Sequence, residues 1–286
     1  MRVRVVSVLK APARMLTILL LVMIGTTILV RLAPGYLSDE REMDARYGQT
    51  ARIQLAEEAA KSHSLLQMVS TELKEWLHGN GGLSRQFQVP VGDLIRPRLA
   101  VTGELLLRSL LLGWVFAVCA AIVSSAGRNP SAFWQMPATL LLAVPTAAMA
   151  TLCLLSGEGG PVLVMALLVA ARDFKFLHYL LRKAWLEPHL MYARAVGIAT
   201  PRLLVAHLLP SVAGQLAALA SLSIVTALSA LVPVEVIFNI PGLGQLAWNA
   251  ALNRDLPVLL AITLIMALAV TLSGMAPGRQ PEQERA

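Results

Sequence analysis

Few side chains in this sequence have the types and spacing that cofactor chemistry needs. Gly242, Gly244 and Ala247 fit the pattern Gly-x-Gly-x-x-Ala, in which a glycine-rich turn approaches the pyrophosphate of a dinucleotide. The pattern carries weight only inside a strand–helix–strand unit with an acidic residue about 20 positions further on. Here Asp255 follows sooner and a long apolar segment comes next. We therefore reject a dinucleotide site at this turn.

Hydrolytic and metal chemistry also lack their usual residues. The sequence contains no Gly-x-x-x-x-Gly-Lys-[Ser/Thr] loop, no His-Glu-x-x-His and no Gly-x-Ser-x-Gly. The five histidines show no i,i+4 pairing and no adjacent carboxylate: His63, His78, His178, His189 and His207. Cys119 and Cys153 lie in apolar segments at a spacing that matches no metal or redox pair. We expect no metal, no cofactor and no ATP hydrolysis by this chain, and packing roles for both cysteines.

Composition explains why such chemistry is scarce. Of 286 residues, 56% are hydrophobic and only 14% are charged, whereas a soluble domain has about 25% charged residues. The apolar windows are long enough to cross about 30 Å of hydrocarbon as helices. We expect an all-α membrane protein with six transmembrane helices, near Met15–Leu32, Glu104–Ala126, Met136–Ser156, Pro161–Ala171 continuing past Phe176, Pro210–Val232 and Leu256–Gly274.

Two of these segments are less regular than the rest. The first resembles a signal peptide, but its apolar run is long and no Ala-x-Ala site follows, so we favour an uncleaved anchor. The fourth meets Arg172, Asp173 and Lys175 before it has crossed, so it must tilt or extend its charged groups toward water. Ionisable residues are otherwise nearly absent from the segments, which argues against a proton- or ion-coupled carrier.

The basic residues predict the orientation. With the N-terminus inside, the segments predicted to be cytoplasmic collect most Lys and Arg, and the short outer loops hold only Arg254. The net charge of +7 follows from this bias and requires no nucleic acid. We expect both termini in the cytoplasm and divide the chain into residues 1–32 (N-terminus and first helix), 33–103 (outer loop), 104–274 (membrane core, including the cytoplasmic segment 178–209) and 275–286 (tail).

The outer loop contains one amphipathic pattern. Apolar residues recur at helical spacing between Ala51 and His78, and Asn80, Gly81 and Gly82 follow them. We favour a helix packed on the outer ends of the transmembrane helices over a docking site for a partner. Pro90 and Pro97 are expected to break the chain after it.

The cytoplasmic stretch YARAVGIATPRLLVAHLLP, residues 192–210, has an unusual order of residues for so apolar a chain. Leu190–Val196 can form a short helix, and Gly197 can adopt the left-handed conformation that ends it. Pro201 suits the first turn of a following helix. The stretch is read as helix, glycine turn, helix, and equally as a basic loop held inside by its charge.

The fifth transmembrane segment offers polar candidates for a pathway. Gln215 and Thr226 are the main ones, with pore lining and interhelical hydrogen bonding both open for Gln215. The small residues around them have the spacing of close helix contacts: Gly214, Ala217, Ala218 and Ser221.

Residues 192–210 resemble the cytoplasmic coupling segment of ATP-binding-cassette importer permeases. Residues 235–260, EVIFNIPGLGQLAWNAALNRDLPVLL, resemble the segment after the fifth helix in the oligopeptide, dipeptide and nickel branch of that family. The matching positions there are Glu235, Phe238, Pro241, Gly242, Gly244, Arg254, Asp255 and Pro257. RLAPG at 31–35, GNGGLSRQF at 79–87 and PVGDLIRPRL at 90–99 are similar to the outer loop of the same branch.

The resemblance implies a non-catalytic permease subunit in the bacterial cytoplasmic membrane. It would form half of a pore with a second permease chain, driven by cytoplasmic ATPase subunits and supplied with a peptide-like, nickel or other small substrate by an extracytoplasmic binding protein. The implied ATPase-coupling residues are Tyr192, Ala193, Arg194, Ala195, Gly197, Pro201 and His207. The implied outer turn or gate comprises Glu235, Pro241, Gly242, Gly244 and Asp255.

This sequence departs from the family in two places. Met191 and Tyr192 stand where the coupling helix usually has an acidic residue, and only Gly157–Gly160 joins the third and fourth helices. A degenerate permease or membrane scaffold without transport is therefore the alternative.

Overall fold

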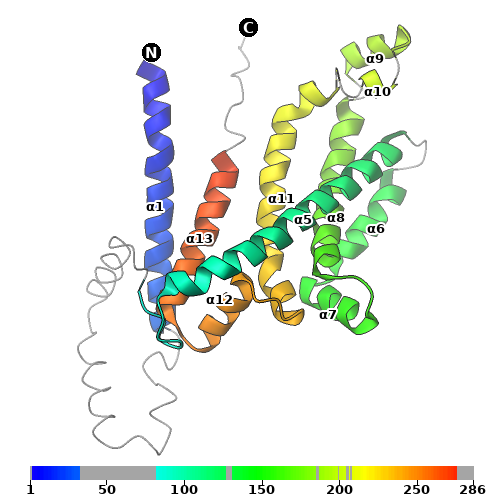
Figure 1. The fold of residues 1–286 in the computed structure, drawn as a ribbon. Helices are drawn as coiled ribbons and strands as arrows, with labels where there is room; N and C mark the ends of the chain where they lie inside the picture. The colour runs from blue at the N-terminus through cyan, green and yellow to red at the C-terminus, as the bar shows by residue number, and fades with distance from the viewer. Residues whose placement is uncertain are drawn as a thin grey trace, which may run out of the picture. The chain divides into compact units, whose positions relative to one another are not determined.

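A computed structural model describes residues 2–32, 82–126, 131–184, 187–198, 200–203, 206 and 208–275. Every regular element in these ranges is a helix, apart from one isolated bridge between Leu83 and Pro90 (Figure 1). The predicted helix at Ala51–His78 and the predicted tail at 275–286 lie outside the described residues, except for Met275. The chain divides into two compact units, which we describe separately: Met1–Leu99 with Leu246–Leu268, and Ala100–Gln245 with Ala269–Ala286.

Three helices in the described residues are long and apolar enough to cross a membrane. They occupy Val91–Ser124, Pro210–Ile237 and Leu256–Gly274, and a bent pair of helices gives a fourth candidate. Arg14–Leu29 forms a shorter apolar stretch in α1, Arg2–Leu32. The protein is thus an all-helical membrane protein, while the count of six stays a prediction.

The fifth and sixth predicted segments are confirmed as helices. They correspond to α11, Leu209–Ile237, and α13, Leu256–Met275. The second predicted segment begins earlier than expected, because α5 runs over Val91–Ala126 and contains Pro97. The prediction that Pro97 breaks the chain is wrong. A proline removes one N–H from a helix, and the long run of helix-forming residues after it keeps α5 continuous.

The prediction of a single transmembrane helix over Met136–Ser156 is also wrong. The structure has α6, Ser131–Ala143, and α7, Thr146–Ser156, which meet at an angle of 93°. Pro145 lies at the break with an extended ψ of 137°. The ring of a proline disfavours a helical conformation in the residue before it, which explains why α6 ends before Val144. Gly157 then ends α7 with a φ of 67°.

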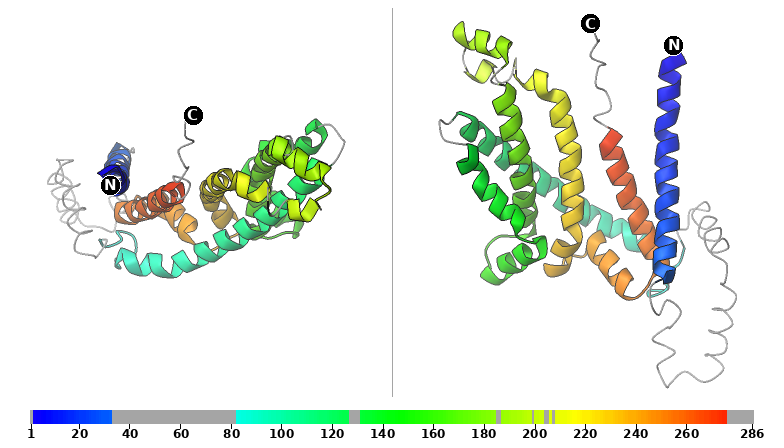
Figure 2. Two further views of the ribbon diagram at one scale, coloured as in Figure 1. Left: turned by 90° about the horizontal axis from the view of Figure 1, so that it is seen from above. Right: turned by 180° about the vertical axis from the view of Figure 1, so that it is seen from behind.

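The unit Ala100–Gln245 is organised around α8, Pro161–Ala184. α11 packs along one side of α8, and α6 and α7 also contact it; α8 and α11 lie side by side in Figures 1 and 2. The buried core contains Phe174, Leu177 and Leu181 of α8 with Val212 and Leu219 of α11. The other helices are therefore positioned by the apolar faces of these two.

At Gly113, the backbone of α5 comes close to that of α8. A Cβ atom at Gly113 would lie 2.9 Å from the carbonyl oxygen of Ala166 and 3.0 Å from the Cβ of Val169. Only a glycine allows the two backbones to come this close. The close contact expected at Gly214 of α11 is not found in the described residues, because a Cβ there would meet nothing within 4 Å.

The unit Met1–Leu99 with Leu246–Leu268 has its own small core. Met23 of α1 is buried, as are Val91 and Ile95 of α5. The first residues of α13 are buried as well, including Leu256 and Leu260. α12, Leu243–Leu252, leads into α13 through a turn in which Arg254 has a φ of 54°.

Candidate functional site

The predicted cytoplasmic segment forms two short helices. α9 covers Pro188–Ala195 and α10 covers Thr200–Leu203. The amides of Leu190 and Met191 donate hydrogen bonds to the carbonyl oxygen of Glu187 at 3.0 Å, so the first donors of α9 are satisfied. α9 and α10 pack against each other, and they lie at the end of α8 opposite to α7 (Figure 1).

Gly197 ends α9 in the manner predicted. Its φ is +86°, and the Ile198 amide donates to the Ala193 carbonyl oxygen at 3.2 Å. This six-to-one hydrogen bond after a left-handed residue is the Schellman arrangement. A Cβ at Gly197 would meet nothing within 4 Å. The backbone conformation, and not a lack of space, therefore requires glycine here.

The two faces of α9 differ sharply. Leu190 and Ala193 are buried in the same core as the apolar residues of α8 and α11. Met191, Tyr192 and Val196 are 57%, 74% and 63% exposed. The segment thus has a buried side continuous with the helix core and an apolar side left open.

Some predicted coupling residues cannot be placed as side chains. Ala195 is exposed at the end of α9. The side chains of Arg194 and Pro201, and all of His207, lie outside the described residues. Pro201 does occupy the second position of α10, within the first turn as predicted.

Glu235 is the centre of the second predicted group. It lies in the last turn of α11 with its side chain fully buried. One carboxylate oxygen accepts the Thr102 hydroxyl at 2.7 Å, and the other accepts the amides of Gly244 at 2.7 Å and Gln245 at 3.1 Å. The Thr102 hydroxyl oxygen in turn accepts the Leu243 amide at 2.8 Å. We call Glu235, Thr102 and these amides the Glu235 cluster.

The Glu235 cluster satisfies the first three amides of α12. These donors have no partner within a helix, and a carboxylate near a helix N-terminus is favourable because of the helix dipole. Gly242 is required by space, since its Cβ would lie 2.2 Å from a carboxylate oxygen of Glu235. A Cβ on Gly244 would lie 2.9 Å from the Cα of Val232. Pro241 beside them is exposed.

Asp255 forms a separate cluster between α12 and α13. It is fully buried and accepts the Ser84 hydroxyl at 2.5 Å. The amides of Arg85 and Gln86 each donate to the same carboxylate at 3.2 Å, and the Phe87 amide donates to the Ser84 hydroxyl oxygen at 3.0 Å. We call this the Asp255 cluster. It fixes residues 84–87, which precede α5, to the start of α13.

The two predicted pathway residues differ in exposure. Gln215 lies exposed on α11, whereas Thr226 is largely buried. Arg172 of α8 donates a hydrogen bond to the Thr226 hydroxyl oxygen. Thr226 donates to the carbonyl oxygen of Leu222 at 2.9 Å. Thr226 therefore connects α11 to the charged part of α8.

Asp173 is a buried acid whose importance the sequence analysis missed. It is fully buried in α8 and accepts the Ser223 hydroxyl at 2.6 Å, while Trp114 donates to the Ser223 oxygen at 3.1 Å. Its other carboxylate oxygen has no hydrogen-bond partner among the described residues. The signal available in the sequence was a lone acid within an apolar helix. No group of three or more metal-ligating side chains occurs in the part of the chain that the structure describes.

Comparisons with known proteins agree on one family. The model of the binding-protein-dependent transport system inner membrane component family matches residues 109–276. The metal-staphylopine import system permease protein CntB of Staphylococcus aureus is 27% identical over 223 residues, 71% of each chain. The glutathione transport system permease protein GsiC of Escherichia coli is 26% identical over 254 residues, 82% of each chain. A putative peptide permease protein of Brucella ovis is 25% identical over 228 residues, 69% of this chain and 72% of its own.

Proposed function

The chain belongs to the family of binding-protein-dependent transport system inner membrane components, and we propose that it forms one half of the membrane pore of an importer. It is a permease subunit of an ATP-binding-cassette importer, of the same kind as its relatives. The other half would be a second permease chain, homologous or identical. Cytoplasmic ATPase subunits and an extracytoplasmic binding protein would complete the system.

The single observation that carries this proposal is the two-sided form of α9. A helix can transmit the conformational change of an ATPase only if one of its sides binds the ATPase and the other side is fixed to the transmembrane helices. Met191 and Tyr192 are exposed and can bind the partner. Leu190 is buried in the core of α8 and α11 and can fix α9 to these helices. The Schellman turn at Gly197 fixes the direction in which the chain leaves α9.

Substitution at Gly197 tests the coupling role. Gly197→Val places a β-branched side chain at a positive φ and should misdirect α9. Arg194→Glu leaves the glycine turn unchanged and reverses one charge in α9, which should weaken binding to a partner surface of complementary charge. Both variants should insert normally yet lose uptake and substrate-stimulated ATP hydrolysis. Gly103→Val is the matched control, because Gly103 lies in α5 with open space around it.

Normal transport by an assembled Gly197→Val variant would contradict the coupling role and favour the interpretation of residues 192–210 as a basic loop. Loss of transport in Gly103→Val to the same extent would point to general damage by valine. Failure of the unmodified chain to copurify with any ATPase would favour a degenerate permease or scaffold.

The proposed topology has six transmembrane helices with both termini in the cytoplasm, an outer loop at 33–103, a membrane core at 104–274 and a tail at 275–286. In a background with Cys119 and Cys153 replaced by Ser, an impermeant thiol reagent added to intact cells should label a cysteine at Gln67 and not one at Ala199. Labelling at Ala199 would reverse the orientation. The background is needed because Cys119 is exposed.

We propose a peptide-like substrate in preference to a metal chelate or another small solute. Two of the three relatives are named for glutathione and peptide transport, and one is named for import of metal-staphylopine. Uptake of labelled short peptides by the assembled transporter tests this choice, with a nickel chelate as the alternative cargo.

A further inference from the structure

Along the chain, α12 lies between two helices that are long and apolar enough to cross a membrane. The apolar window of α11 ends at Ile237, six residues before α12 begins at Leu243. The window of α13 begins at Leu256, four residues after α12 ends at Leu252. A link of six residues reaches about 20 Å at most when it is fully extended. Both ends of α12 are therefore held near the ends of membrane-crossing helices, which places α12 at the membrane surface.

Both links are closed by Schellman turns. After α11, Asn239 has a φ of 50°, and the next amide donates to the carbonyl oxygen of Glu235 at 2.8 Å. After α12, Arg254 has a φ of 54°, and the next amide donates to the carbonyl oxygen of Ala250 at 2.8 Å. In each turn a six-to-one hydrogen bond closes around a left-handed residue. Backbone hydrogen bonds thus determine how the chain enters and leaves α12.

The sides of α12 differ in character. One side is buried and apolar: Leu243, Leu246 and Ala250. Trp248 and Leu252, one helical turn apart, are 47% and 64% exposed, and we call these two side chains the α12 strip. Gln245 and Asn249, also one turn apart, lie on the flank beyond the strip. Asn249 is exposed, and the Gln245 amide group donates to the side-chain oxygen of Asn239 at 2.7 Å. The open part of α12 is therefore divided into an apolar strip and a polar flank.

A helix that lies on a membrane surface has this division. Its apolar side enters the boundary between lipid head groups and acyl chains, and its polar side stays in water. Tryptophan is enriched at this boundary, because its indole combines a large apolar ring with one N–H donor. Exposure of the α12 strip to water would instead leave apolar surface hydrated, which is unfavourable.

A protein partner fits the α12 strip less well than lipid. Two partly exposed side chains offer a few hundred square ångström, whereas each partner in a stable complex of standard size buries about 800 Å². Lipid requires no minimum area. It is also the surrounding that the apolar windows on both sides of α12 in the chain require.

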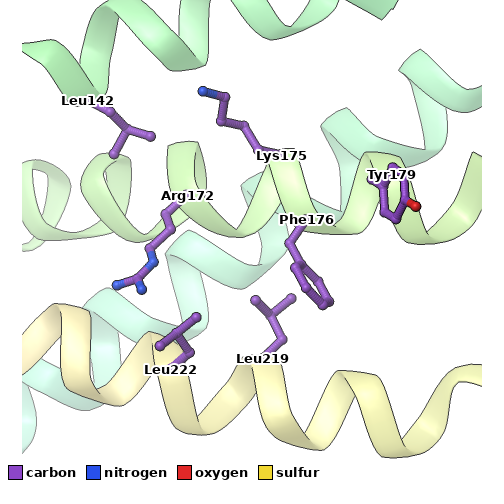
Figure 3. A pocket seen from close by; sticks show the side chains of 7 residues that line it. All are labelled: Leu142, Arg172, Lys175, Phe176, Tyr179, Leu219 and Leu222. Carbon is purple, nitrogen blue, oxygen red and sulfur yellow. The ribbon is translucent and has the colours of Figure 1, made fainter.

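The groove between α6, α8 and α11 shows that this division is not common to every open apolar surface of the described residues. The groove has a volume of about 380 Å³, and Arg172 and Lys175 line it together with apolar side chains. In Figure 3 Arg172 extends toward α11 and Lys175 extends toward α6. Its charged groups thus lie on opposite sides and form no single polar flank, unlike Gln245 and Asn249 of α12.

We propose that the α12 strip binds the membrane surface, with the indole of Trp248 at the boundary between lipid head groups and acyl chains. Leu252 contacts the acyl chains, and Asn249 faces water. In the proposed topology this is the outer surface of the membrane. The inference goes beyond the proposed function, because it requires only that α11 and α13 cross the membrane and holds for any cargo.

The test measures the surroundings of single nitroxide labels on the complete transporter in vesicles of phosphatidylethanolamine and phosphatidylglycerol. Cys119 and Cys153 are replaced by Ser, and the other subunits are freed of reactive cysteine. Trp248→Cys and Leu252→Cys each place a label on the α12 strip. Asn249→Cys is the matched control, because Asn249 is the exposed neighbour of Trp248.

Two collision rates are compared at each label. Oxygen concentrates in hydrocarbon, whereas chromium oxalate stays in water. The ratio of the oxygen rate to the chromium oxalate rate should be several-fold higher at positions 248 and 252 than at position 249.

The native Trp248 side chain is tested separately by fluorescence. The chain has five tryptophans, so the emission of Trp248 is taken as the difference between the unmodified transporter and Trp248→Phe. Lipids brominated on their acyl chains should quench this difference, and aqueous iodide should not. This measurement decides the matter if Trp248→Cys fails to assemble.

Equal collision ratios at positions 248 and 249, or quenching of Trp248 by iodide alone, overturn the proposal, because the strip then faces water. Low collision rates with both reagents at positions 248 and 252 also overturn it, since the strip is then covered by another protein such as the second permease chain. Neither result affects the proposed function, which is tested at Gly197.

Discussion

Truncation of Glu235 should destabilise the protein, because the hydrogen bonds that its carboxylate accepts would be lost. Its two oxygens receive the Thr102 hydroxyl and the amides of Gly244 and Gln245. In Glu235→Ala these three donors stay in a buried environment without an acceptor. Each such group costs about 1 to 3 kcal/mol, so we expect a loss of about 3 kcal/mol at the lower end of that range.

Glu235→Gln separates hydrogen bonding from charge. The amide oxygen of Gln can still accept the N–H donors of Gly244 and Gln245, and its NH2 group can donate to the Thr102 hydroxyl oxygen. The loss of stability should therefore be smaller than in Glu235→Ala. An equal loss in the two variants would show that the charge, and not the set of acceptors, stabilises this turn.

The two glycines of the turn supply a matched pair of tests. The three heavy atoms nearest to a Cβ on Gly242 all belong to the Glu235 carboxylate, at 2.2 to 2.3 Å, whereas the atom nearest to a Cβ on Gly244 is the Cα of Val232, at 2.9 Å. Gly242→Ala should thus be strongly destabilising alone and nearly neutral when combined with Glu235→Ala. Gly244→Ala should be destabilising in both backgrounds.

Stability is measured as the denaturation temperature of the detergent-solubilised transporter, with the folded fraction followed by size-exclusion chromatography. The quantity that decides is the coupling between the two substitutions in a double-mutant cycle. Additive effects of Gly242→Ala and Glu235→Ala would refute the reasoning, because they would mean that the glycine is not required by the carboxylate.

Two other predictions concern single contacts. Ser84→Ala removes the hydroxyl that donates to Asp255 and accepts the Phe87 amide. It should destabilise the protein by about 1 to 2 kcal/mol and make proteolysis after Arg85 faster. An unchanged rate of cleavage would contradict this role of the Asp255 cluster. Gly113→Ala places a Cβ 2.9 Å from a backbone oxygen of α8, so it should lower the denaturation temperature. The control Gly103→Ala has open space and should be neutral or slightly stabilising; equal losses at both sites would contradict the close approach.

The sequence predicted those parts of the fold that depend on residues close together in the chain, such as single helices and the turn at Gly197. The apolar runs predicted α13 to within one residue at each end, but they ended α11 five residues too early, because length and hydropathy identify such helices better than they fix where one ends. Gly197 was expected at a positive φ and has one, since helix, glycine and proline follow each other within a few residues. The break at Pro145 was equally local, and it was missed because the apolar run continues across it.

Contacts between distant residues could not be predicted in this way. Thr102 and Glu235 are 133 positions apart, and Ser84 and Asp255 are 171 positions apart. The resemblance placed both acids in a segment important to the family, but nothing in their spacing identifies a hydroxyl partner. Asp173 was treated as an obstacle to crossing the membrane, whereas the structure buries it against Ser223.

The three buried acids have different chemical capacities. The oxygens of Glu235 and Asp255 each accept at least one N–H or O–H donor, so dipoles and not cations stabilise these carboxylates. Neither of these two acids has an oxygen left without a donor. Asp173 keeps one oxygen without a partner in the described residues, and Arg172 beside it donates to Thr226. In the proposed function, energy for transport would come from the ATPase through α9.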